Sequence, residues 1–110
     1  MNTRFEYLYR DACNYKSYND VVVSGVLNKT DIQPYLKDKT FFIPSEIGLP
    51  DLQEMEFSPD DHIWHEIESI SPTNDAPTIT FSAREIIEGF RKASQNGWNE
   101  YVVFSRKGLI

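Results

Sequence analysis

Cysteine is nearly absent from this chain of 110 residues, since Cys13 is the only one and an internal disulfide is therefore excluded. No run of about 18 apolar residues occurs, so no membrane-spanning helix is expected. The N-terminal residues lack a basic stretch followed by an apolar segment, and a secretory signal peptide is not expected either. These absences predict a cytoplasmic protein without a membrane partner.

Basic residues are missing from the whole middle of the chain, because no Lys or Arg lies between Lys39 and Arg84. That central segment contains nine acidic residues: Glu46, Asp51, Glu54, Glu56, Asp60, Asp61, Glu66, Glu68 and Asp75. Such a segment repels phosphate backbones, so no nucleic-acid partner is expected. It suits a basic protein partner or a cation, and the alternative is a surface that serves only solubility.

Sequence motifs that are typical of particular enzyme reactions are also missing. The five glycines are isolated from one another, so neither a phosphate-binding glycine loop nor a serine nucleophile elbow is present. His62 and His65 are the only histidines, and any mechanism that needs a histidine must use one of them.

Apolar residues make up 40% of the chain and aromatic residues 14%, which is enough for one hydrophobic core. Without repeats or linkers, residues 1–110 are predicted to form a single domain, with 105–110 as a frayed tail. Alternating apolar residues predict a strand at 3–9, and valine-rich sequence predicts a second strand at 20–27. The capping-box pattern of Thr30 and Gln33 predicts a short helix at 30–38.

The second half of the chain contains the clearest helix signal. Ser82 and Glu85 form a capping box, an apolar stripe follows, and Gly97 ends the helix predicted at 82–96. Short strands are predicted at 40–43 and 100–104, and an irregular loop at 45–57, of the length that binding loops often have. Residues 61–70 fit either a helix or a strand, and we favour a strand.

These elements predict an α+β fold, in which a small, mostly antiparallel sheet is covered on one face by a C-terminal helix and a short second helix.

The first candidate site is the 9–16 stretch, with Tyr9, Arg10, Asp11, Asn14, Tyr15 and Lys16 as its binding residues. A guanidinium between two phenols can grip a planar anionic or amide-bearing ligand. The alternative is a hairpin turn whose Asp and Asn side chains bind their own backbone.

The second candidate site is the 60–66 stretch, with Trp64, His65 and Glu66 as further binding residues. His62 and His65 are candidate ligands for a transition metal ion. On a helix both would share one side, whereas on a strand they point to opposite sides. The alternative is an exposed His62, a packed His65 and no cofactor.

The chain resembles a group of small uncharacterised bacterial proteins that carry five of its stretches in the same order, across roughly residues 5–98: Tyr9-Arg10-Asp11, Asn14-Tyr15-Lys16, Phe41-Phe42-Ile43-Pro44, Gly48-Leu49-Pro50 and Asp61-His62-Ile63-Trp64-His65-Glu66. The resemblance implies a bacterial origin and a single-domain fold, and it favours a strand at 62–70. The group has no assigned activity, so the resemblance assigns no functional residues.

Three functional hypotheses remain. The first is a non-enzymatic interaction module, of immunity or antitoxin type, that binds a basic protein through the acidic central segment. The second is a small enzyme or ligand-binding domain, which requires the 9–16 and 60–66 stretches to meet. The third is an assembly subunit that forms a homodimer through an edge strand.

Overall fold

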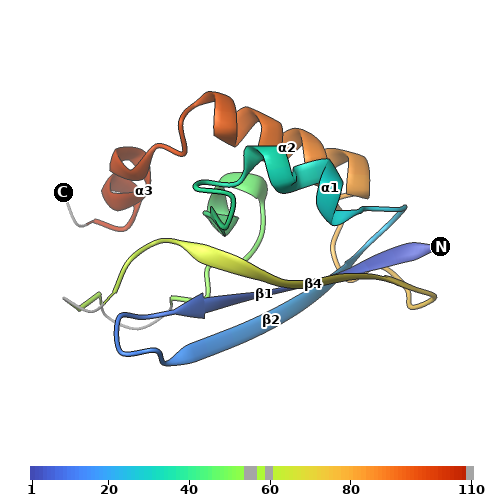
Figure 1. The fold of residues 1–110 in the computed structure, drawn as a ribbon, viewed down its shortest axis with the longest axis horizontal. Helices are drawn as coiled ribbons and strands as arrows, with labels where there is room; N and C mark the ends of the chain where they lie inside the picture. The colour runs from blue at the N-terminus through green and yellow to red at the C-terminus, as the bar shows by residue number, and fades with distance from the viewer. Residues whose placement is uncertain (54–56, 59–60, 109–110) are drawn as a thin grey trace.

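The computed structural model describes residues 1–53, 57–58 and 61–108. Its four strands form one antiparallel sheet in the order β2-β1-β4-β3: β1 (Asn2–Arg10), β2 (Lys16–Val23), β3 (Phe41–Phe42) and β4 (His65–Thr73). The described helices are α1 (Lys29–Ile32), α2 (Ala83–Gln95), α3 (Glu100–Arg106) and the 3-10 turns η1 (Gln33–Tyr35) and η2 (Pro44–Ile47). They lie on one face of the curled sheet, which confirms the predicted α+β fold (Figure 1).

β1 is an inner strand, and its alternation decides which side chains enter the core. Phe5, Tyr7 and Tyr9 are buried on the face that meets the helices, as the strand prediction requires. The ring of Phe5 lies 6.4 Å from that of Phe90 on α2, and the apolar stripe of α2 thus covers the centre of the sheet.

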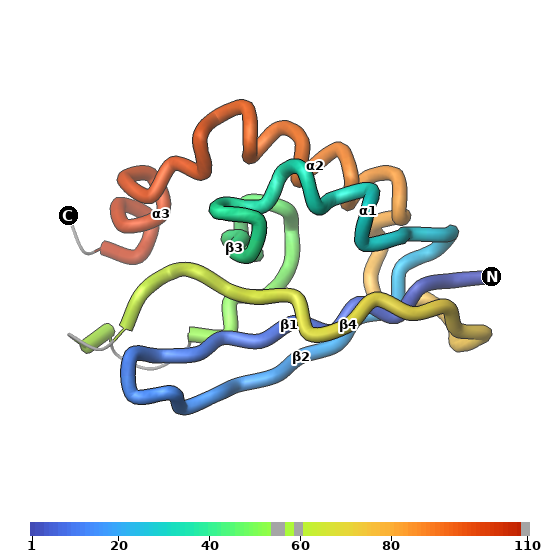
Figure 2. The backbone as a smooth tube through the Cα atoms, viewed as in Figure 1, coloured from blue at the N-terminus to red at the C-terminus, as the bar shows by residue number. Residues whose placement is uncertain are grey.

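The ambiguous segment at 61–70 forms a strand from His65 onward, as we favoured. β4 pairs with β1 along its length, and Tyr9 lies opposite His65. The register shifts between Glu6 and Tyr7, which marks a β-bulge in the middle of this pair. After β2 the chain therefore passes through β3, η2 and the loop that follows before β4 pairs with β1 (Figure 2).

The helix predicted at 82–96 is confirmed together with its caps. The Ser82 side chain accepts a hydrogen bond from the Glu85 amide, and the Glu85 carboxylate accepts one from the Ser82 amide. Gly97 follows the helix with φ of +72°, the left-handed conformation that favours glycine at this position.

One predicted element has different ends, and another is wrong. The short helix predicted at 30–38 is present as α1, which ends at Ile32, and the 3-10 turn η1 that continues to Tyr35, but its capping box is formed by Asn28 and Asp31. The strand predicted at 100–104 is the helix α3, whose first turn is capped by the Asn99 side chain.

The predicted tail at 105–110 is partly held in the fold. Ser105 and Arg106 belong to α3, and Lys107 forms an ion pair with Asp51. Residues 109–110 lie outside the described residues. None of the described helices is long and apolar enough to cross a membrane.

Gly48 lets η2 approach the segment that precedes α2. Its φ is +84°, and a Cβ atom built on it would lie 2.7 Å from the ring of Phe81. Gly97 also has a positive φ, but a Cβ there would meet no atom within 4 Å. Comparing alanine substitutions at Gly48 and Gly97 therefore separates two free-energy costs. One is the cost of a side chain at a positive φ, and the other is the cost of displacing the Phe81 ring.

We expect Gly48→Ala to lower the free energy of unfolding more than Gly97→Ala does. Both variants place a side chain at a positive φ, which costs about 1–2 kcal/mol, and only Gly48→Ala also displaces the Phe81 ring. Chemical denaturation of both variants measures the difference. Equal losses of unfolding free energy in the two variants would show that displacing the Phe81 ring costs no stability.

Candidate functional site

The 9–16 and 60–66 stretches meet where β1 pairs with the start of β4. The Tyr9 hydroxyl donates a hydrogen bond to the Asp61 carboxylate (2.6 Å) and accepts one from the His62 amide (3.2 Å). The His62 Nε2 atom donates to the Arg10 carbonyl (2.6 Å), while its Nδ1 atom accepts from the Trp64 amide (3.0 Å). The spatial requirement of the ligand-binding hypothesis is therefore met, for the residues that the structure describes.

The side chains at this junction bind one another. Burial is the main reason that the pKa of the Tyr9 phenol is raised, and the hydrogen bond from Tyr9 is the main reason that the pKa of Asp61 is lowered. Arg10 Nε lies 3.2 Å from Glu66 Oε2, although its N–H is not aligned with an acceptor, and Arg10 also donates to the Asn14 side chain (3.0 Å). The guanidinium that we expected to clamp a ligand thus has internal partners.

The end of the hairpin follows the alternative reading of its sequence. The Asp11 carboxylate accepts hydrogen bonds from the amides of Cys13 and Tyr15, both at 2.9 Å, and Asn14 has φ of +66°. This is a turn held by an aspartate side chain. Tyr15 and Lys16 project into solvent, and the Tyr15 side chain is 77% exposed.

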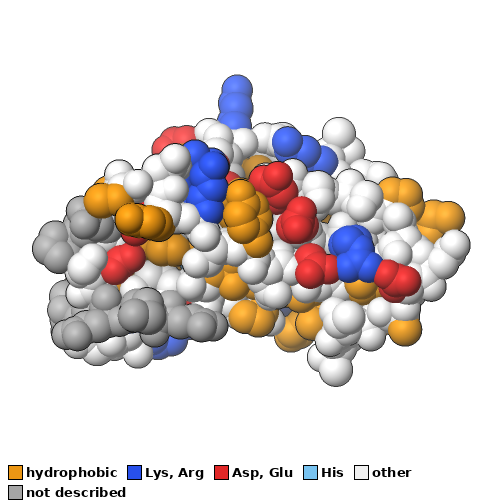
Figure 3. Space-filling model, turned by 90° about the horizontal axis from the view of Figure 1, so that it is seen from below, with side chains coloured by type: hydrophobic (Ala, Val, Ile, Leu, Met, Phe, Trp, Pro, Cys, Tyr) orange, Lys and Arg blue, Asp and Glu red, His pale blue; other side chains and the backbone are white. Residues whose placement is uncertain are grey.

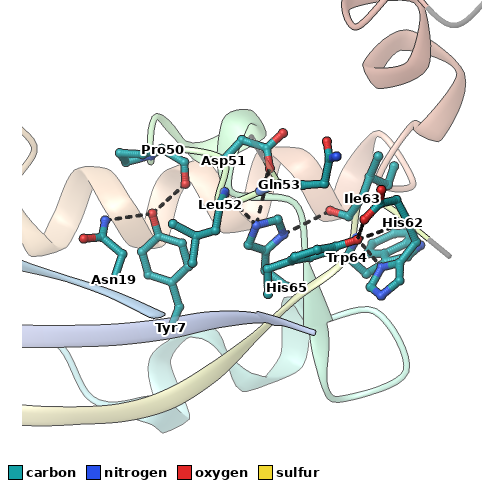
Figure 4. Close-up of polar contacts among 12 residues, drawn as sticks. Tyr7, Asn19, Pro50, Asp51, Leu52, Gln53, His62, Ile63, Trp64 and His65 are labelled. Carbon is teal, nitrogen blue, oxygen red and sulfur yellow. Dashed lines mark hydrogen bonds and ion pairs between the residues drawn. The ribbon is translucent and has the colours of Figure 1, made fainter. Parts of the chain in front are cut away.

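Trp64 and His65 point to different sides of the chain. The half-buried Trp64 donates from Nε1 to the Glu100 carboxylate (3.0 Å), and its ring contacts Trp98. His65 is completely buried: its Nε2 atom accepts from the Leu52 amide (3.1 Å) and its Nδ1 atom lies 3.2 Å from the Ile63 carbonyl (Figure 4). These contacts require a neutral imidazole with its proton on Nδ1.

Burial also keeps His65 neutral at pH 7, since it lowers the pKa to about 4. The Asp51 carboxylate lies 3.4 Å from Nε2 and opposes this effect without overcoming it. Nearby, the Tyr7 hydroxyl donates to the Pro50 carbonyl (2.6 Å) and accepts from Asn19 (Figure 4). Tyr7 and His65 together fasten the loop at 50–52 to the sheet.

The metal hypothesis on His62 and His65 finds no support in the described part of the chain. There, no group of three or more His, Cys, Asp or Glu side chains is placed to hold a metal ion. The ring nitrogens of both histidines contact backbone groups, and Asp60 lies outside the described residues.

Where the structure describes the acidic central segment, most of its carboxylates pair with cations from the two ends of the chain. Four of its six described carboxylates form ion pairs, in the pairs Glu46–Arg106, Asp51–Lys107, Glu66–Arg10 and Asp75–Arg4. Glu54, Glu56 and Asp60 lie outside the described residues. On the face seen from below, acidic and basic side chains are interspersed (Figure 3).

Sequence reasoning missed a pocket between η2 and α2. Its volume is about 370 Å³, and it is lined by Glu46, Ile47, Gly48, Phe81, Glu85, Glu88, Gly89 and Lys92. A Cβ built on Gly89 would lie 3.4 Å from Ile47, so the glycine allows α2 and η2 to pack closely at the pocket. The only sequence signal for it was the length of the loop predicted at 45–57.

Comparisons with protein-family models, curated proteins and solved structures find no match.

Acid should destabilise the fold through His65. Its pKa lies at about 4 in the folded chain and near 6.5 in the unfolded chain, so protons bind preferentially to the unfolded chain between these values. The free energy of unfolding should therefore fall by about 3 kcal/mol between pH 7 and pH 4 from this group.

Denaturant unfolding at a series of pH values measures this loss. His65→Gln keeps one acceptor and one donor but does not titrate, so its unfolding free energy should depend less on pH in this range. The natural chain, unfolded over the same series of pH values, is the reference for this comparison. An unchanged dependence in His65→Gln would contradict the assignment.

Proposed function

We propose that the protein is a non-enzymatic interaction module, whose pocket between η2 and α2 receives a positively charged side chain of a basic protein partner. One observation carries this proposal: three glutamates, Glu46, Glu85 and Glu88, line a pocket that also contains apolar surface. Lys92 is the only basic residue among those that line it.

The pocket has the chemistry that a Lys or Arg side chain requires. Ile47, Phe81 and the Cα atoms of the two glycines offer apolar surface to an aliphatic stem. The carboxylates can bind an ammonium or guanidinium group, and the ring of Phe81 can add a cation–π contact. A volume of about 370 Å³ lies near the lower end for ligand pockets, which suits one side chain.

The glutamates already interact with donors of the chain itself. Glu46 pairs with Arg106, Glu88 with Arg91, and Glu85 accepts the amide of Ser82. Arg91 lowers the pKa of Glu88, which is therefore charged at neutral pH. A carboxylate has about four acceptor positions, and exposed ion pairs contribute little, so an incoming cation can join or replace these partners.

The sequence suggested a basic partner bound through the acidic central segment, and this proposal restricts the binding site to one pocket. The central segment contributes Glu46, while Glu85 and Glu88 come from the helix that follows it. The ion pairs of Asp51, Glu66 and Asp75 reduce the support for a partner bound along the whole segment.

Titration of the isotope-labelled protein with N-acetyl-arginine methylamide tests the proposal by NMR. The amide signals of Gly48 and Gly89 should shift, because both line the pocket, whereas those of Gly25 and Gly97 should not. The lysine analogue should act in the same way and the glutamate analogue should not. Added salt should weaken binding, since the contact is ionic.

A pair of matched variants separates the pocket from the total charge. Glu85→Gln with Glu88→Gln should weaken binding about tenfold, and glutamine at position 85 can keep the helix cap. Glu6→Gln with Glu68→Gln removes the same charge from β1 and β4, outside the pocket, and should bind as the natural chain does. Equal weakening in both would overturn the pocket assignment, as would the absence of shifts at Gly48 and Gly89.

A further inference from the structure

The strand β2 is an edge of the sheet, and one part of this edge is covered by the chain itself. The Val22 amide donates to the Thr78 hydroxyl (2.8 Å), and the Thr78 amide donates to the Val22 carbonyl (2.9 Å). These bonds show that the backbone groups of Val22 point away from β1.

Because this direction alternates along a strand, the backbone groups of Lys16, Tyr18 and Asp20 also point away from β1. Among the described residues, no backbone hydrogen bond beyond the sheet is made by these three. Their side chains are exposed, and that of Tyr18 is 53% exposed. The pairing of β2 with β1 runs from Lys16 to Val23 without a register shift, so this edge is regular. A regular, exposed edge is a template for another strand.

We propose that this edge pairs with the same edge of a second copy of the chain, antiparallel and centred on Tyr18. Each copy then places Lys16 opposite Asp20 of the other, and symmetry makes this contact twice. Side chains directly opposite lie on the same face of a sheet, with Cβ atoms about 4.5–5.5 Å apart, so the opposite charges meet. The two four-stranded sheets become one continuous sheet.

Charge and coverage select this register among the alternatives. Centring the pair on Lys16 or on Asp20 sets like charges opposite each other, which is destabilising. Centring it on Asn19 sets Lys16 opposite Val22, whose backbone is already bonded to Thr78. Centring it on Ser17 sets Asp20 opposite Asn14, which is in the turn and has a positive φ.

The second copy also extends a row of charges on the outer face. Arg4 lies between Asp20 and Asp75 and forms an ion pair with each. Lys16 of the second copy would add a cation on the other side of Asp20, so positive and negative groups would alternate along the row. Asp20 can accept both cations, because its carboxylate has about four acceptor positions.

Sedimentation of the full chain over a range of concentrations tests the proposal, and we expect a reversible dimer. Tyr18→Pro should abolish it, because proline removes an outward N–H that the dimer needs and β1 does not. Tyr18→Thr is the matched control, since it keeps the N–H and a strand-forming residue, and it should still dimerise. Amide spectra should show that each variant remains folded.

Two further measurements fix the register. Lys16→Glu should weaken the dimer about tenfold, because like charges then meet twice, and adding Asp20→Lys should restore most of the loss. Hydrogen exchange at the amides of Lys16, Tyr18 and Asp20 should slow as concentration rises, while Ser17 and Asn19 should be protected throughout. A chain that stays monomeric, or a dimer that survives Tyr18→Pro, would overturn the proposal.

Discussion

The antiparallel pairing of β1 with β4 determines the rest of this structure. β1 lies between β2 and β4, so one strand joins the N-terminal hairpin to a segment more than 50 residues away. On the inner face the pairing sets Tyr9 beside His65 under the helices. On the outer face it brings Arg10 to Glu66, and it leaves Arg4 close to Asp75 just beyond the end of β4. The meeting of the two motif-rich stretches is a consequence of this register.

The fold also changes what the charge pattern of the sequence implies about the surface of the protein. Basic residues are confined to the two ends of the sequence, and the middle is acidic, which predicts an anionic surface. In the fold, β1, α3 and the residue after α3 bring three arginines and one lysine from the two ends onto carboxylates of the middle. Exposed ion pairs of this kind add little stability, but they reduce the field that a distant partner would feel. The basic partner that we propose would therefore have to be bound at a local concave site, and the pocket beside α2 is concave.

The sequence predicted correctly those elements of the fold that have a strong local pattern. The strand predicted from residue 3 has alternating apolar residues, and the helix predicted from Ser82 has a capping box and an apolar stripe. Both elements are confirmed. The segment 100–104 has adjacent valines and suggested a strand, but Asn99 caps a helix there, and only Val103 is buried. The pocket could not be predicted, because Glu85 also serves as a cap and Glu88 lies on the polar face of a helix, where glutamate is ordinary. Only the packing of Gly89 against Ile47 brings those carboxylates beside Glu46.

Two tyrosines and the two histidines have a common structural task. Between η2 and β4 the chain lacks regular secondary structure where it is described, so its backbone groups need partners other than a helix or a sheet. Side chains supply them: Tyr7 binds the Pro50 carbonyl, His65 the Leu52 amide, and Tyr9 the His62 amide. His62 binds the Trp64 amide and the Arg10 carbonyl, which ties the loop to the end of β1. Tyrosine and histidine suit this task because their polar atoms lie at the end of a ring that can itself be buried. A concentration of tyrosine and histidine in a sequence can therefore reflect a loop that is held by side chains, and the contacts of these four side chains are with the chain itself.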